Sequence, residues 1–510
     1  MRPSQYLRSL STLAAVLAVA GCSHAAFQSS RTDSVTPAAT QTSELTSEPL
    51  ATPPAPLPLE PIEFPPFHER TLANGARVIV VPNREQPVVS VSVAFRGGGS
   101  AADPQDKAGV AELTADLMTK GTATRNAQEI AETIAFVGGQ LSVTAGEDWT
   151  ILRTTVLTDF ADTALSVLAD VLAQPKFPAA ELESTRKRML SALQVSYGEP
   201  TVLAERRFRQ ELYGQHPYGR TTTPASLAAI TREDDVGFYE RFYRPSQSLI
   251  IVAGDVEPAS IVARLDRAFA KWSPGDSPAR HVATLATLPA PAKRRLVIVH
   301  KPGSVQAVYR VGHLLPAASS ADWVEIGVLR AILSDRLMDV LREQKGYTYS
   351  AYAIAAEQQQ AGHWAVNTEV RTEEAHNALA EMLRIMEQLR SGPVQADALA
   401  NMKSALTGVF PIMTETPQQV GDTLMTTLLL GRPVEYLESF RTQVAATTTT
   451  ADIERVAHEY LHPDRLVIVV VGDATQLLEK LRPFADSVEL YDVNGQPLAA
   501  ESLTTAAQPQ

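Results

Sequence analysis

The sequence of 510 residues contains one cysteine, Cys22, so no disulfide can form within the chain. Hydrophobic residues make up 45% of the chain, and a chain of this length can bury a core large enough to be stable without disulfides. The length suggests about two to four domains.

Positive charge is also scarce. The chain has 45 Lys and Arg residues against 57 Asp and Glu residues, which gives a net charge of −12, and it has no basic run interleaved with aromatic residues. A protein that binds nucleic acid usually carries a basic patch. We therefore expect no nucleic-acid partner.

The N-terminal apolar run, residues 13–20, is too short to cross a bilayer as a helix. It follows Arg2 and Arg8, as in an export signal, and residues 17–22 resemble a bacterial lipobox. We expect residues 1–22 to be a lipoprotein signal peptide and Cys22 to be acylated, which would anchor the protein in a membrane. Ser23 after the cysteine implies the outer membrane of the cell envelope, facing the periplasm. The alternative is a plain signal peptide with an incidental cysteine.

Residues 23–61 are rich in Ser, Thr, Ala and Pro and predict a disordered tether. Folded structure should begin near residue 62, where an Asn74-Gly75 turn precedes the β-rich run 77–81 and predicts a hairpin. Hydrophobic periodicity predicts strands at 88–95, 140–145 and 149–157, and helices at 109–120, 126–137, 160–172 and 179–197.

The chain contains an internal repeat. Residues 242–255 align without gaps on residues 460–473, and in both segments a proline follows a helix and an apolar strand runs to Gly-Asp. The period is too long for a solenoid and indicates a duplication. We predict an α+β fold with two homologous domains, 62–275 and 294–490, each a mostly antiparallel sheet packed with helices. Residues 276–293 would be a linker and 491–510 a disordered tail.

Two such halves resemble the pitrilysin, insulinase and mitochondrial processing peptidase family of inverted-zinc metallopeptidases over residues 62 to 490. The segments that carry the resemblance are 109–122, 212–219, 230–234 and 341–349. The resemblance implies that this chain forms half of a clamshell closing around an unfolded peptide.

Active members of that family carry His-x-x-Glu-His on one helix, where the two histidines hold zinc and the glutamate is the general base. A second glutamate about 75 residues later completes the site. Here the corresponding positions are Glu112, Ala115, Asp116 and, distally, Ala192. Because the base and the distal ligand are both missing, we expect no metal in this chain and no peptide hydrolysis by the chain alone.

Arg342 and Tyr349 stand at the spacing of an Arg/Tyr pair in the C-terminal half of family members. The resemblance implies that they hydrogen-bond the substrate carbonyl or its oxyanion at a zinc site. A guanidinium and a phenol suit this role, since both donate hydrogen bonds where negative charge develops. Tyr347 is a nearby competitor for the role of Tyr349. Without the resemblance, an exposed arginine and a core tyrosine would explain the same residues.

His458 and His462 match the His-Glu-x-x-His pattern of ordinary zinc proteases. His462 directly precedes Pro463, however, and no histidine follows it. We interpret the two histidines as surface residues at a helix end.

Together these features predict the non-zinc subunit of a two-chain envelope peptidase. Its partner would be a homologous chain carrying His-x-x-Glu-His and the zinc, and its substrates would be unfolded peptides. The alternatives are a non-catalytic scaffold lipoprotein and an autonomous hydrolase that uses His458 and His462.

Overall fold

The computed structural model describes residues 64–273, 288 and 292–505. The predicted signal peptide with Cys22, the tether and nearly all of the linker 276–293 lie outside these residues. Within the described residues, no helix is both long enough and apolar enough to span a membrane.

The first sheet has the strand order β1-β2-β6-β3-β5-β4. Neighbouring strands are antiparallel, except that β2 and β6 are parallel. The strands are β1 His68–Thr71, β2 Arg77–Pro82, β3 Val88–Arg96, β4 Gln140–Ala145, β5 Trp149–Leu157 and β6 Ser248–Gly254. The helices of this half are α1 Val110–Met118, α2 Ala127–Phe136, α3 Ala161–Ala173, α4 Ala179–Ser196, α5 Pro200–Tyr213, α6 Pro224–Ala229, α7 Arg232–Phe242 and α8 Pro258–Ala268.

The second sheet has the order β12-β7-β11-β8-β10-β9. Its strands are β7 Arg295–His300, β8 Gln306–Leu315, β9 Thr348–Ala356, β10 Gly362–Arg371, β11 Val467–Gly472 and β12 Ser487–Tyr491. The helices of this half are α9 Trp323–Leu337, α10 Ala375–Ser391, α11 Ala396–Met413, α12 Pro417–Leu429, α13 Glu435–Thr442, α14 Thr450–Tyr460, α15 Ala474–Leu481 and α16 Ser502–Thr505.

Apart from the outermost strands β1 and β12, the two sheets share one topology, which confirms the predicted pair of mostly antiparallel α+β halves. The repeated segments supply β6 and β11, and each of these strands lies between a parallel and an antiparallel neighbour. The outermost strands differ, because β1 pairs with β2 antiparallel whereas β12 pairs with β7 parallel.

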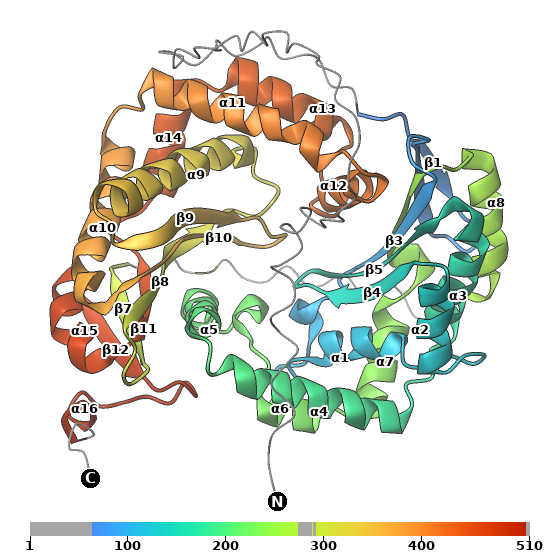
Figure 1. Cartoon of the computed structure of the whole chain (residues 1–510), viewed down its shortest axis with the longest axis horizontal. Coiled ribbons are helices and arrows are strands. Elements are labelled where there is room, and N and C mark those ends of the chain that lie inside the picture. The colour runs from blue at the N-terminus through green and yellow to red at the C-terminus, as the bar shows by residue number, and fades with distance from the viewer. Residues whose placement is uncertain (1–63, 274–287, 289–291, 506–510) are drawn as a thin grey trace, which may run out of the picture. The chain divides into compact units, whose positions relative to one another are not determined.

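The halves exchange helices (Figure 1). Helix α5 of the first half packs on β8 and β11 of the second sheet, and helix α12 of the second half packs on β3 and β6 of the first sheet. Leu203, Ala204 and Phe208 of α5 are buried against valines of the second sheet, and Leu424 and Met425 of α12 are buried against the first. As a result, Pro58–Gln510 forms one compact unit.

A buried polar network also joins the halves. The Tyr218 hydroxyl donates to the Asp148 carboxylate, whose other oxygen accepts a hydrogen bond from the backbone N–H of Gln359 at 3.1 Å. The Tyr213 hydroxyl donates to Gln358 at 2.8 Å. The 212–219 segment of the first half therefore holds the chain between β9 and β10 of the second.

The predicted disordered tail was placed too early. Beyond β12 the chain forms hydrogen bonds between Asp492 and Gln496, and Leu503 of α16 is buried in the core of the second half. Leucines spaced along a polar segment give little periodic signal, so the sequence did not reveal this packing.

Candidate active-site remnant

Helix α1 carries Glu112, Ala115 and Asp116, the positions predicted to correspond to a degenerate zinc motif. It begins after Gly109, which adopts a φ of 109°, and the buried Asp103 carboxylate accepts hydrogen bonds from the N–H groups of Gly109 at 2.7 Å and Ala111 at 2.8 Å. Burial raises the pKa of Asp103 to about 7, and these two donors oppose the rise. The helix start is thereby fixed.

Glu112 and Asp116 lie one turn apart on the accessible face of α1, as their spacing predicts. Ala115, at the position of the general base, is only 2% exposed. Its methyl group packs inward and cannot take a proton. Position 115 therefore cannot supply a general base, because its side chain has no basic group and is buried.

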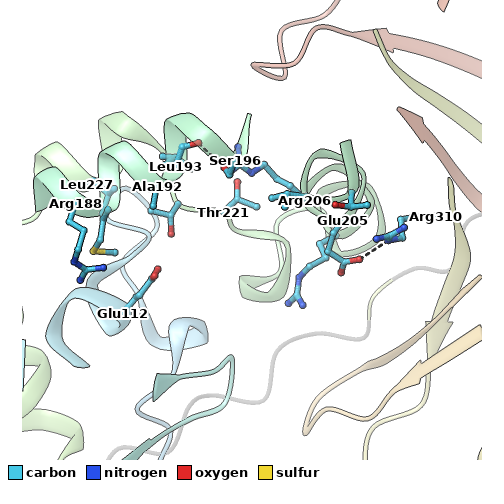
Figure 2. A pocket seen from close by; sticks show the side chains of 15 residues that line it. Glu112, Arg188, Ala192, Leu193, Ser196, Glu205, Arg206, Thr221, Leu227 and Arg310 are labelled. Atoms are coloured by element: carbon cyan, nitrogen blue, oxygen red, sulfur yellow. Dashed lines mark hydrogen bonds and ion pairs between the residues drawn. The ribbon is translucent and has the colours of Figure 1, made fainter. Parts of the chain in front are cut away.

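Helix α4 lies across from these residues, and Figure 2 shows Ala192 and Arg188 of α4 beside Glu112. Arg188, one turn before Ala192, forms an ion pair with Asp116. A guanidinium therefore stands among the residues that correspond to the zinc ligands.

Glu112 lines a cavity, and neighbouring groups partly desolvate its carboxyl. This desolvation raises its pKa, the nearby Asp116 raises it further, and Arg188 opposes the shift. One carboxylate that is already paired with Arg188, a second carboxylate beside it and alanines at the predicted base and distal positions do not fit zinc. Among the described residues there is also no group of three or more His, Cys, Asp or Glu side chains that could hold a metal ion.

The cavity has a volume of about 650 Å³ and lies between α4 and α5. The α5 side contributes Glu205, Arg206 and Arg209, and Arg310 of β8 closes it from the second half. Arg310 pairs with Glu205 at 3.2 Å, as the dashed line in Figure 2 marks. The cavity is therefore walled by both halves of the chain.

Arg342 and Tyr349 lie together elsewhere. Arg342 is in a π-helical turn, Met338–Gln344, and its guanidinium carbon lies 4.9 Å from the ring centre of Tyr349 on the edge strand β9. Tyr349 is 83% exposed, and Arg342 also pairs with the neighbouring Glu343 at 3.3 Å. Neither Arg342 nor Tyr349 lines the cavity beside Glu112.

Tyr347 differs from Tyr349, because it is half-buried against the core of the second half. Tyr349 is thus the tyrosine that stacks with Arg342 and faces solvent.

The His458 and His462 pair does not form a metal site. Helix α14 ends at Tyr460, and His462 lies beyond it, where its ring contacts Arg465 at 2.9 Å and packs near His313. The two histidines do not share a helix, as a zinc protease of that class requires.

Comparisons with known proteins agree with this fold. Residues 77–225 match the family model described as insulinase (peptidase family M16), and residues 229–406 match the model described as peptidase M16 inactive domain. The chain belongs to peptidase family M16.

Relatives within M16 carry differing names. An uncharacterized zinc protease YmxG of Bacillus subtilis is 24% identical over 71% of this chain and 88% of its own length. A non-peptidase homolog YmxG of Helicobacter pylori is 24% identical over 73% of this chain and 86% of its own.

Solved M16 structures share the fold. A peptidase M16 inactive domain from Pseudomonas fluorescens matches with a TM-score of 0.73 and 25% identity, over 80% of this chain and 98% of that one. The periplasmic protease PqqL from Escherichia coli matches with a TM-score of 0.68 and 14% identity, over 85% of this chain and 49% of that one. This chain therefore has the fold of half of the PqqL chain.

The sequence reasoning missed two features of the site. Arg188 stands four residues before Ala192, and this helical spacing could have placed its side chain at the lost ligand position. Arg310 had no such signal, because its place in the cavity depends on the packing of α5 against the second sheet.

Proposed function

We propose that this chain is the non-zinc subunit of a two-chain envelope metallopeptidase. It would bind unfolded peptides and supply Arg342 and Tyr349 to the zinc centre of a homologous partner carrying His-x-x-Glu-His. The observation that carries the proposal is the exposed Arg342–Tyr349 pair in a chain whose own predicted zinc-site positions include two alanines and an aspartate paired with Arg188.

The pair suits transition-state stabilisation. The cation–π contact orients the Arg342 guanidinium while its N–H groups and the Tyr349 hydroxyl remain able to donate. Tyr349 lies at the start of the edge strand β9, and Arg342 stacks on it from the preceding π-helical turn. A peptide adding to this edge by backbone hydrogen bonds would pass these donors.

The fold supports a subunit role. This chain has the fold of half of the PqqL chain, so a second homologous chain would complete an assembly of that size. The matches to an inactive domain and to a non-peptidase homolog fit a chain without its own zinc site. Acylation of Cys22 would tether the complex to the outer membrane, facing the periplasm.

The experiment uses the reconstituted pair with an unstructured fluorogenic peptide. Arg342→Ala or Tyr349→Phe should lower kcat by about 10²–10³-fold, since each removes a donor to the oxyanion. Tyr352→Phe, an exposed tyrosine on the same strand, is the matched control and should leave kcat unchanged. Size-exclusion chromatography should show the same complex for all variants.

A non-catalytic scaffold is the second candidate, and the non-peptidase name of the Helicobacter pylori relative favours it. If Arg342→Ala and Tyr349→Phe leave the activity of the assembled pair at the wild-type level, the scaffold function is the correct one. Zinc in equimolar amount in the chain alone, together with peptidase activity, would contradict both candidates.

A further inference from the structure

The arginines that line the cavity beside Glu112 differ in whether they have a carboxylate partner. The cavity is lined by four arginines, and three of them have carboxylate partners. Arg188 pairs with Asp116, Arg209 with Glu147 at 2.7 Å and Arg310 with Glu205 at 3.2 Å.

Arg206 is different. Among the described residues, no carboxylate lies within ion-pair distance of its guanidinium, which lies 4.6 Å from the ring centre of Tyr197 and donates a long hydrogen bond of 3.4 Å to the Ser196 hydroxyl. A guanidinium stacked on an aromatic face keeps in-plane N–H donors for a planar acceptor. Arg206 therefore presents one uncompensated positive charge to the cavity.

The cavity also contains hydroxyl groups. Ser196, Thr201, Thr221 and Thr222 line the same cavity. The Thr221 hydroxyl accepts a hydrogen bond from Gln210 at 2.9 Å, so its own proton can be donated to a ligand. The cavity wall thus offers several hydroxyl donors, besides the Arg206 guanidinium, to an anionic oxygen.

We propose that this cavity binds one carboxylate group of a peptide, held by Arg206. A carboxylate matches the single uncompensated guanidinium in charge and in its two parallel acceptor oxygens, whereas a phosphate dianion would leave one negative charge uncompensated. The volume of about 650 Å³ is within the range of ligand pockets and accommodates a short peptide segment.

Glu112 restricts which residues of the peptide can lie next to the bound carboxylate. It is exposed within the same cavity, and among the described residues no cation lies within ion-pair distance of it. A second acidic group of the ligand would be repelled by Glu112. The cavity therefore favours a peptide in which the carboxylate neighbours neutral or basic residues. This inference rests on the proposed function, since both require that the chain binds peptides.

The test measures binding of labelled, unstructured nonapeptides to the purified chain by fluorescence anisotropy. The first peptide lacks Asp and Glu and ends in a free α-carboxylate, the second is its C-terminal amide, and the third is the amide with one internal Glu. We expect the free acid to bind about tenfold more tightly than the amide, as for one charge-assisted hydrogen-bonded pair. Tight binding of the third peptide would show that the site binds the carboxylate of an acidic side chain. Tight binding of the first peptide alone would show that it binds the α-carboxylate at a chain end.

Arg206→Ala should abolish the preference for the carboxylate and leave binding of the amide unchanged. Arg206→Gln, which keeps hydrogen-bond donors and most of the side-chain volume, should also lose the preference. Arg384→Ala is the matched control, because Arg384 forms an ion pair with Glu381 on α10 and does not line the cavity. Thermal melting verifies that each variant is folded.

Three results would overturn the proposal, and they differ in what else they overturn. If the wild-type chain binds acid and amide equally, or if Arg206→Ala weakens both equally, the carboxylate site is wrong while peptide binding stands. If no peptide binds to the chain at all, the peptide-binding part of the proposed function fails as well.

Discussion

At the scale of single residues, the predicted degenerate zinc motif differs from an intact one in more than its missing ligands. Ala115 and Ala192 remove the base and one ligand, but Arg188 also adds a positive charge paired with Asp116. A divalent cation would have to displace this guanidinium or share its carboxylate. The site has therefore become an ion-paired surface that disfavours metal.

Asp235 on α7 gives a pH-dependent prediction. Its side chain is fully buried, burial raises its pKa from 3.8 to about 7, and Thr114 of α1 donates to it at 3.1 Å. The folded state therefore holds a proton that the unfolded state releases, and stability must fall as pH rises from about 4 to about 7. Asp235→Asn cannot ionise. Urea denaturation should show that it reduces the loss of unfolding free energy between pH 5 and pH 8 by at least about 1 kcal/mol.

The neighbouring Asp234 supplies the control. Burial of its carboxyl is outweighed by hydrogen bonds from Lys107 and Thr231, which lower its pKa. Its stabilising ion pair is already complete at pH 5, so Asp234→Asn should change stability equally at pH 5 and pH 8. An unchanged pH dependence in Asp235→Asn would show that Asp235 ionises normally in the folded protein.

Sequence reasoning could place some site residues and not others. Helical spacing was enough to put Glu112 and Asp116 on one face, and the resemblance marked Arg342 and Tyr349. The sequence could not show that Arg342 stacks on Tyr349, because that contact joins a residue of a helical turn to a residue of a strand. Nor could it show that Arg206 has no carboxylate partner among the described residues, since ion-pair partners are set by tertiary packing.

At the scale of elements, the predicted boundaries agree closely with the structure. β4, Gln140–Ala145, and β5, Trp149–Leu157, have the predicted bounds, and α4, Ala179–Ser196, ends one residue earlier than predicted. These segments have clear periodicity of two or 3.6 residues. Periodicity shows which face of a helix is buried but not what buries it, so the destinations of α5 and α12 could not be predicted.

The facing pair of α1 and α4 predicts how metal binding could be restored. The substitutions Glu112→His, Ala115→Glu, Asp116→His and Ala192→Glu recreate the ligand and base types of active relatives. They also remove the carboxylate partner of Arg188 and leave its charge beside two imidazoles. We expect this fourfold variant to bind zinc at least about tenfold more weakly than the same variant with Arg188→Ala, because the charges repel.

Competition with a chelating dye would measure the zinc affinity of both variants. Lys187→Ala in the fourfold variant is the matched control, since Lys187 is the adjacent exposed cation on the same helix and does not line the cavity. Equal affinities with and without Arg188 would show that its charge does not disfavour the metal.

At the scale of the whole molecule, the duplication predicts two domains, but the exchange of helices makes them depend on each other. One face of the first sheet is covered by α12, so residues 58–275 alone would expose Ile79, Val81 and Ile251 to water. The second sheet would likewise lose the cover that α5 provides.

We therefore expect residues 58–275 and 292–510, produced separately, to aggregate or bind a hydrophobic dye, and to become soluble together when co-expressed. Analytical ultracentrifugation and dye fluorescence would measure this. Two separate halves that are monomeric and melt cooperatively would contradict the expectation.

The exchanged helices have a consequence for how such chains can change over time. A substitution on α5 must be accommodated by a sheet that the other repeat encodes, and the same holds for α12. A change in α5 or α12 therefore requires a matching change in the sheet that the helix covers, and that sheet belongs to the other repeat. A chimera that joins the first repeat of this protein to the second repeat of a distant M16 relative should fold poorly, unless α5 and α12 are each transferred with the sheet that they cover.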